Sequence, residues 1–205
     1  MEFSRGTFFK EKGSPHPSKN LFRQEGLYNL FMKLMIASDL HGSAYYTKLA
    51  LDFYKNCGAD KLVLLGDILY HGPRNDLPKD YAPKEVAPML NEFAAQIIAV
   101  RGNCEAEVDS LMLDFPVTPD YAVIFDGTAT MYFSHGHREE PKMAEGSVYL
   151  TGHTHIPHDF VKDGVRYLNP GSVSIPKNGS AHSVMVYENG QFRRFDIETG
   201  AEYTL

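Results

Sequence analysis

The spacing of hydrophobic positions changes repeatedly along this chain after residue 31. A short, uninterrupted apolar run at residues 34–38 is typical of a strand buried on both faces. In residues 43–56, apolar side chains recur at helical spacing, and Gly58 follows as a stop signal. The same alternation predicts further strands at residues 62–65 and 97–100, a proline-rich loop at residues 70–82, and helices at residues 83–93 and 105–115.

Beyond Pro116 the pattern becomes one of short strands and turns. The dipeptides Asp126-Gly127 and Asn189-Gly190 are typical of tight hairpin turns. Candidate strands are residues 121–125, 130–134, 148–151, 166–168, 183–187 and 192–196. We therefore expect an α/β first half followed by a β-rich second half, with two sheets packed face to face and helices outside.

The first 31 residues have no strand or helix period and no contiguous hydrophobic stretch, so they make a poor secretory signal. They are more aromatic than a typical disordered tail, which leaves three readings: a start-codon or cloning artefact, a docking arm, or a segment packed on its own domain. Residues 32–39 look like a natural chain start that enters a first buried strand. We expect residues 1–31 to be a non-catalytic N-terminal extension and residues 32–205 to form the functional domain.

Composition narrows the class of protein. A chain of 205 residues suits one domain. Its net charge of −6 argues against a general nucleic-acid binder. Cys57 and Cys104 form no CxxC pair, so we expect a reduced, cytoplasmic setting. No apolar run approaches the roughly 20 residues that a membrane span needs. A homo-oligomer is left open, because no sequence feature points to one.

Residues of the kinds that bind metal ions follow the ends of successive predicted strands, each beside a glycine. The carboxyl ends of strands in an α/β sheet are where ligands usually bind, and glycine lets a ligand approach the backbone closely. Each element alone occurs often by chance, but five in this order predict a metal centre. The candidate ligands are Asp39, His41, Asp67, Asn103, His135, His153 and His155.

Oxygen and imidazole ligands without a thiolate suit Mn²⁺, Fe, Zn²⁺ or Mg²⁺ and disfavour Ca²⁺. Two divalent ions bring four positive charges, Asp39 and Asp67 remove two, and a bridging hydroxide leaves a centre of about +1, suited to an anionic phosphodiester. Paired ions can clamp the attacking and leaving oxygens of an in-line displacement, and they lower the pKa of bound water towards about 7. No serine or cysteine nucleophile is then required.

The series Asp39-x-His41, Gly66-Asp67, Gly102-Asn103, His135-Gly136 and Gly152-His153-x-His155 resembles the calcineurin-like metallophosphoesterases, from residue 32 to the C-terminus. Residues 71–75 (HGPRN) and 169–172 (NPGS) look like segments of the small bacterial, YfcE-like phosphodiesterases. The resemblance implies a four-layer αββα sandwich of two mixed β-sheets and two metal ions, often manganese. It also implies that Asp39, His41 and His155 bind one ion, that Asn103, His135 and His153 bind the other, and that Asp67 bridges the two.

One position departs from the family pattern. Many relatives carry a histidine after the asparagine, where it can protonate the leaving group, but this chain has Cys104. A thiol is a weaker hydrogen-bond donor, and general acid catalysis is typically worth roughly 10²–10⁴-fold. We therefore expect either a preference for good leaving groups or another acid. His137 is expected to orient His135 or to be that acid, with His41 and His71 as further candidates.

Two residues are candidate substrate contacts. Arg74, in the proline-rich loop, could grip a phosphate bidentately, although a solvated loop arginine is an equal alternative. Cys104 could contact substrate or simply pack as a small buried side chain.

The leading hypothesis is a dinuclear metal-dependent phosphodiesterase that hydrolyses small phosphodiesters by in-line attack of a metal-bridging hydroxide. The alternatives are a phosphomonoesterase or nuclease on the same core, and a non-catalytic scaffold of the same fold. The complete ligand set argues against a scaffold. The acidic charge and the lack of interleaved basic and aromatic residues argue against a processive nuclease. The sequence leaves monoester and diester activity unseparated.

Overall fold

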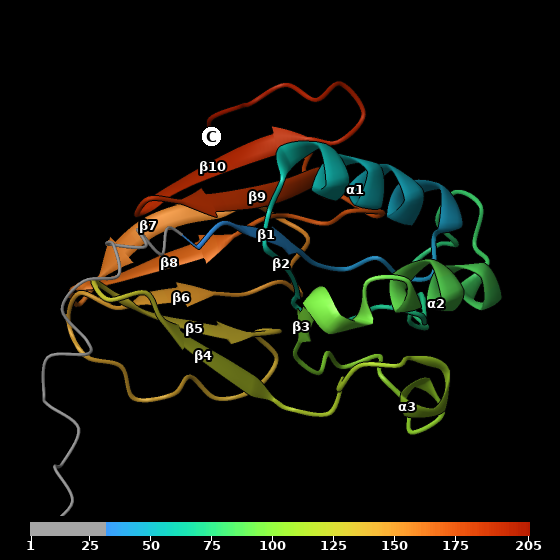
Figure 1. Ribbon diagram of the computed structural model, residues 1–205, viewed down its shortest axis with the longest axis horizontal. Helices are drawn as coiled ribbons and strands as arrows, with labels where there is room; N and C mark the ends of the chain where they lie inside the picture. The colour runs from blue at the N-terminus through green and yellow to red at the C-terminus, as the bar shows by residue number, and fades with distance from the viewer. Residues whose placement is uncertain (1–31) are drawn as a thin grey trace, which may run out of the picture. The chain divides into compact units, whose positions relative to one another are not determined.

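The computed structural model describes residues 32–205 (Figure 1); residues 1–31, the predicted N-terminal extension, lie outside the described part. The first sheet has the strand order β10-β9-β1-β2-β3. Its strands β1, β2 and β3 are parallel, whereas β9 runs antiparallel to β1 and β10 antiparallel to β9. The bounds are β1 (Leu34–Ala37), β2 (Lys61–Leu64), β3 (Ile97–Ala99), β9 (Ser183–Glu188) and β10 (Gln191–Asp196).

The second sheet has the order β4-β5-β6-β8-β7 and is also mixed. Strands β5, β6 and β8 are parallel, and the edge strands β4 and β7 pair antiparallel to their neighbours. The bounds are β4 (Tyr121–Phe125), β5 (Thr130–Ser134), β6 (Val148–Leu150), β7 (His158–Lys162) and β8 (Val165–Asn169).

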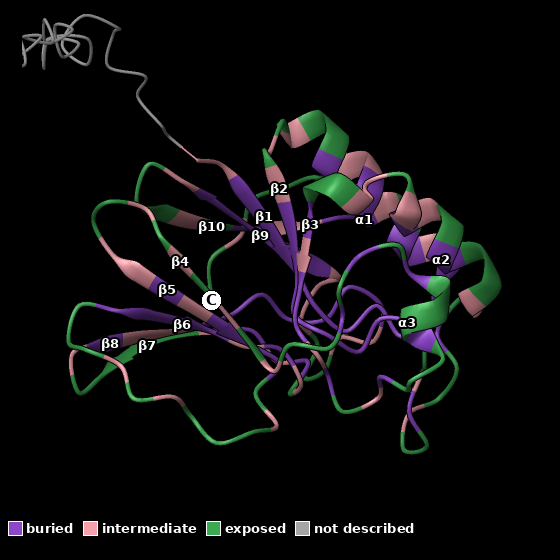
Figure 2. Ribbon diagram, turned by 60° about the horizontal axis from the view of Figure 1, so that its bottom comes forward, coloured by how far each residue is buried: buried purple, intermediate pink, exposed green. Residues whose placement is uncertain are grey.

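Helices lie on the face of the first sheet that is turned away from the second sheet (Figure 2). They are α1 (Ala44–Cys57), α2 (Pro83–Asn91) and the 3₁₀ turn η1 (Ala94–Gln96), whereas the short α3 (Asp109–Met112) lies among the loops that follow the strands. The Ser43 hydroxyl accepts a hydrogen bond from the Tyr46 amide and so caps the start of α1. Gly58 ends α1 in the left-handed conformation, with φ of 66°. None of the helices in residues 32–205 has the length and apolar character that crossing a membrane requires.

Alternate side chains of the central strands enter two separate cores. Met35, Leu62 and Leu64 pack against α1 and α2. Leu34, Ile36 and Phe133 lie between the two sheets. Strands β1 and β2 are therefore buried on both faces, as their uninterrupted apolar sequence predicts.

The predicted α/β fold of two packed mixed sheets with flanking helices is confirmed, with one refinement. Within residues 32–205, the outer face of the second sheet is contacted by the irregular segment that joins β5 and β6. The Tyr121 hydroxyl donates to the Glu139 carbonyl oxygen, and the Tyr167 hydroxyl donates to the Glu140 carboxylate at 3.1 Å. The helices α1 and α2 and the turn η1 belong to the first sheet's side.

Two elements differ from the sequence predictions. The helix predicted at residues 105–115 is reduced to α3, because Glu105 is buried as a hydrogen-bond acceptor and Leu111 is 84% exposed, so no apolar stripe faces the core. Strand β7 was missed, because four of its five residues are exposed. The turn Asp163-Gly164, with φ of 51° and 74°, carries the hairpin signal that marks it.

Candidate metal centre

The predicted ligands all follow strands whose carboxyl ends meet at one end of the two sheets, where Figure 2 shows buried loops gathered. In the first sheet, parallel β1, β2 and β3 lead to residues 39–41, 67 and 103. In the second sheet, parallel β5 and β6 lead to residues 135 and 153–155. Parallel pairing within each sheet and the packing of one sheet on the other thus bring side chains that are up to 116 residues apart in sequence into one site.

One cluster consists of Asp39, His41 and His155, all buried. Nε2 of His155 lies 3.2 Å from Oδ1 of Asp39, and Nε2 of His41 lies 3.6 Å from the same oxygen. Nδ1 of His41 donates to the Tyr70 carbonyl oxygen at 2.8 Å, and Nδ1 of His155 donates to that of Ile175 at 2.6 Å. Such hydrogen bonds fix the rings so that Nε2 of each is directed at a common point, as metal-binding histidines require.

A second cluster consists of Asn103, His135 and His153. Nε2 of His135 lies 3.1 Å from Oδ1 of Asn103 and 3.2 Å from Nδ1 of His153. Nδ1 of His135 donates to the Leu65 carbonyl oxygen at 2.7 Å. Nε2 of His135 is therefore left for a ligand, together with the amide oxygen of Asn103 and a ring nitrogen of His153.

Asp67 lies between the two clusters. Its Oδ1 is 3.4 Å from Nε2 of His135, and its Oδ2 is 3.8 Å from Nε2 of His41. The side chain is buried, and the Cys104 amide donates to Oδ1 at 2.9 Å. Each carboxylate oxygen is thus directed at a different cluster, which is the arrangement that a bridging carboxylate needs.

The charges at this site require cations. Oδ1 of Asp39 is buried and accepts no hydrogen bond from the described residues. Burial alone would raise the pKa of Asp39, but the imidazoles of His155 and His41 hold it well below its usual range. Burial lowers the pKa of His135, but Asp67 and Asp39 raise it to about 9. Protons on imidazole nitrogens and metal ions compete for the same positions, so the donor set fits divalent ions.

The backbone is strained at five of the predicted ligands. Asp39, His41, Asp67, His153 and His155 have φ between 46° and 66°, in the left-handed region. Aspartate and histidine tolerate this region better than most residues, but each such residue still costs on the order of 1–3 kcal/mol. Strain of this kind gathers at functional sites, where the surrounding structure enforces it.

Glu105 is a site residue that the sequence patterns did not reveal. It is 8% exposed, and its carboxylate accepts hydrogen bonds from the backbone amides of Asp67 at 3.0 Å, Ile68 at 2.6 Å and Gly102. Burial and the charge of Asp67 raise its pKa to about 7. A side chain at Gly102 would lie 2.6 Å from Oε2 of Glu105, so glycine is needed there. Glu105 therefore ties the loop after β2 to the loop after β3.

The segment 169–172 supports the site as a structural turn. The Ser172 hydroxyl donates to the Asp39 carbonyl oxygen at 2.9 Å, and the Asn169 side-chain amide donates to the Gly152 carbonyl oxygen at 2.8 Å. These bonds fix the backbone beside two ligand-bearing loops.

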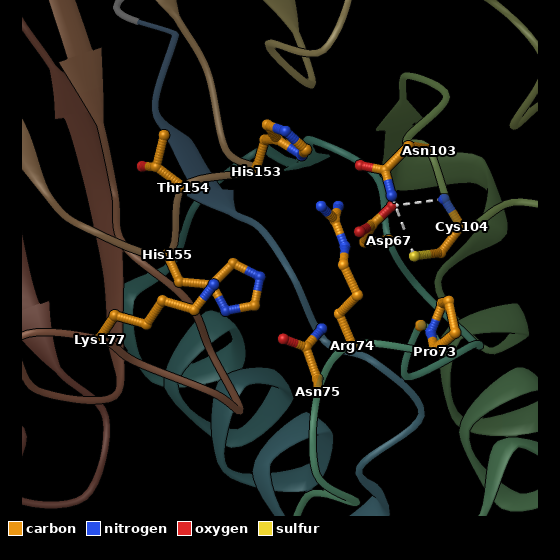
Figure 3. A pocket seen from close by; sticks show the side chains of 11 residues that line it. Asp67, Pro73, Arg74, Asn75, Asn103, Cys104, His153, Thr154, His155 and Lys177 are labelled. Atoms are coloured by element: carbon orange, nitrogen blue, oxygen red, sulfur yellow. Dashed lines mark hydrogen bonds between the residues drawn. The ribbon is translucent and has the colours of Figure 1, made fainter.

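A cavity of about 390 Å³ opens over the clusters (Figure 3). Arg74 and Cys104, the two candidate substrate contacts, both line it. Lys177, from a different loop, lines it as well and was not among the sequence candidates. Burial and the charge of Asp67 raise the pKa of the Cys104 thiol far above its usual value, which keeps the thiol neutral.

His137 lies beside His135, and its predicted roles are to orient that ring or to act as the general acid. Nδ1 of His135 donates to the Leu65 carbonyl oxygen. Nδ1 of His137 is buried without a hydrogen-bond partner among the described residues, and the two ring centroids lie 5.4 Å apart. Burial and the charge of His135 lower the pKa of His137. Both roles of His137 stay predictions.

Residues 32–191 match the calcineurin-like phosphoesterase superfamily domain. The chain belongs to this superfamily. Phosphodiesterase YfcE of Escherichia coli (strain K12) is 44% identical over 162 residues, which cover 77% of this chain and 88% of the relative. A solved structure of YfcE, described as a phosphoesterase from E. coli, superposes with a TM-score of 0.82 at 40% identity, covering 84% of this chain and 97% of that one.

More distant structures share the fold alone. Vacuolar Protein Sorting 29 from Cryptosporidium parvum is 18% identical with a TM-score of 0.57, over 84% of this chain and 95% of that one. The predicted family is thus confirmed, and a superfamily of metallophosphoesterases implies divalent metal ions at the ligand clusters.

Proposed function

We propose that this chain is a phosphodiesterase that hydrolyses small phosphodiesters at a two-metal centre. The observation that carries the proposal is the position of Asp67, whose two carboxylate oxygens lie 3.4 Å and 3.8 Å from histidine nitrogens of separate clusters. One carboxylate so placed can hold two ions together. The similarity to phosphodiesterase YfcE supports the reaction class.

The ligands divide between two positions. Asp39, His41 and His155 would hold one ion, and Asn103, His135 and His153 the other, with Asp67 shared. When bound, the ions would supply water of lowered pKa and polarise the phosphoryl oxygens. We propose Mn²⁺, the ion that the resemblance to this family implies; the oxygen and imidazole donors also fit Zn²⁺, Fe or Mg²⁺.

The cavity above the clusters would hold the phosphodiester. Arg74 and Lys177 line it from two loops and would neutralise the anionic phosphoryl oxygens. Cys104, being neutral, would add no repulsion to the phosphate. Its weak donor strength implies that leaving groups with low pKa are hydrolysed fastest.

The test combines metal analysis with turnover of bis(p-nitrophenyl) phosphate and of p-nitrophenyl phosphate, each with Mn²⁺ added. We expect two ions per chain and faster hydrolysis of the diester. Less than one ion per chain together with no diester turnover would sink the proposal. Faster hydrolysis of the monoester would favour a phosphomonoesterase.

The shared ligand is tested by Asp67→Ala, which should lose both ions and at least roughly 10³-fold of turnover, because electrostatic stabilisation of the reacting oxygens is lost. Asp76→Ala is the matched control, since Asp76 is an exposed aspartate of the neighbouring loop. If Asp67→Ala keeps two ions, the bridge is misassigned.

A further inference from the structure

A second concave surface lies beside the catalytic cavity. It is a groove of about 490 Å³, and its walls are mainly apolar. The loop after β2 contributes Tyr70 and Tyr81, and the segment around α3 contributes Val108 and Met112. A volume of this size falls within the range of roughly 300–1,000 Å³ that is common for small-molecule sites.

The groove adjoins the catalytic cavity at Cys104. This residue borders both the groove and the catalytic cavity. Its amide donates to Oδ1 of Asp67, the predicted bridging ligand. On the groove's other side, the Tyr70 carbonyl oxygen accepts the hydrogen bond that fixes His41. A group that enters the groove would therefore lie beside Cys104, which bonds to Asp67, and beside Tyr70, which bonds to His41.

The groove walls leave large apolar side chains in contact with water. Tyr70 is 41% exposed, Val108 56% and Met112 43%. Exposed apolar groups gathered at the rim of a polar site mark a place where a ligand excludes water. Val108 and Met112 lie at the start and the end of the short α3, of which Asp109 is the buried residue.

The aromatic content of one wall favours a flat ligand. Tyr70 and Tyr81 line the groove, and each packs edge to face on His71, which is not a lining residue, with centroids 4.7 Å and 5.1 Å apart. Aromatic pairs of this kind present faces and edges to which a further ring can pack. Met112 is flexible and polarisable, so it can adapt to such a ring.

We propose that this groove, defined by Tyr70, Tyr81, Val108 and Met112, binds an aryl group esterified to the phosphate at the metal centre. The inference rests on the proposed function, and it names the substrate class as phosphodiesters with at least one aromatic alcohol. Cys104 lines both hollows, so a phosphodiester that spans them would pass beside its small side chain.

Binding of two phosphonates tests this inference, because each carries only one organic group. Calorimetry on the Mn²⁺-loaded full chain would compare phenylphosphonate with methylphosphonate. We expect phenylphosphonate to bind about tenfold more tightly, since it buries the apolar area of a ring in addition to the same phosphonyl contacts. Met112→Glu should remove most of this preference and leave methylphosphonate binding unchanged.

Leu111→Glu is the matched control. Leu111 precedes Met112 in the same short helix, is 84% exposed, and does not line the groove. The phenyl preference should persist in this variant. Val108→Asp, at another exposed wall position, is the second variant should Met112→Glu fail to fold as judged by circular dichroism.

The outcomes separate the groove from the metal centre. Equal affinity of the two phosphonates, or an equal effect of Met112→Glu and Leu111→Glu, overturns the groove and leaves the proposed function standing. If neither phosphonate binds to protein that contains two ions, the proposed function fails and the groove proposal fails with it.

Discussion

Removing the Glu105 carboxylate should destabilise the domain strongly, even without metal. Glu105→Ala leaves the buried amides of Asp67, Ile68 and Gly102 without their acceptor. Each buried, unpaired amide costs roughly 1–3 kcal/mol. Water that enters the vacated space recovers part of this, so we expect a loss of about 3–5 kcal/mol from a total of roughly 5–15 kcal/mol. Glu105→Gln keeps one acceptor oxygen and should lose about half as much.

Urea unfolding of the chelator-treated protein measures this loss without interference from metal binding. Glu107→Ala is the control, because Glu107 is an exposed glutamate of the same segment. The Glu105 variants should also bind Mn²⁺ more weakly, because the backbone of Asp67 is no longer held. If Glu105→Ala unfolds within about 0.5 kcal/mol of Glu107→Ala, the range expected for surface substitutions, then the three hydrogen bonds do not hold the two loops together.

Three further predictions concern the charge on His135, a general acid at position 104 and the N-terminal segment. His135 has a folded pKa of about 9, above its unfolded value of roughly 6.5, so its stabilisation is complete below pH 6.5 and is lost as the pH rises through 9. The difference in unfolding free energy between the metal-free protein and its His135→Gln variant should therefore shrink, by up to about 3 kcal/mol, from pH 6.5 to 9; a growing difference would contradict the charge assignment. Cys104→His should raise kcat for diesters with alkyl leaving groups by roughly tenfold or more, with little gain for p-nitrophenyl esters, because only poor leaving groups need an acid; an equal gain for both would refute an acid role. A chain that starts at Met32 should keep full diesterase activity by steady-state assay, and a large loss would point to docking or assembly by residues 1–31.

The sequence was sufficient for those parts of the fold and site that depend on short-range order. Buried strands such as β1 and β2 are uninterrupted apolar runs, and side chains that follow parallel strands must meet at one edge. The clustering of Asp39 with Asp67 could therefore be predicted, whereas the approach of His155, from the other sheet and 116 positions away, was implied by the family resemblance.

The parts that could not be predicted depend on how loops meet in space. Glu105 fits the start of a helix equally well, and only the approach of the loop after β2 gives it the amides of Asp67 and Ile68 as donors. Lys177 comes 22 residues after His155 and carries no local signal for the cavity it lines. The spacing of Val108 and Met112 satisfies a helical period, yet both side chains remain exposed at the groove. Such disagreement between the local sequence pattern and the observed structure is expected near functional sites, where a chain departs from regular structure.

The left-handed backbone at the ligand positions restricts any attempt to change the metal preference by design. A replacement at residues 39, 41, 67, 153 or 155 must supply a donor atom and also tolerate φ of 46–66°. Asparagine, aspartate and histidine meet both conditions, whereas glutamate and cysteine, the usual means of hardening or softening a site, are less tolerant of that region. Selectivity is therefore more readily tuned at Asn103 and His135, which have ordinary backbone angles, and through the carbonyl groups that orient the imidazoles.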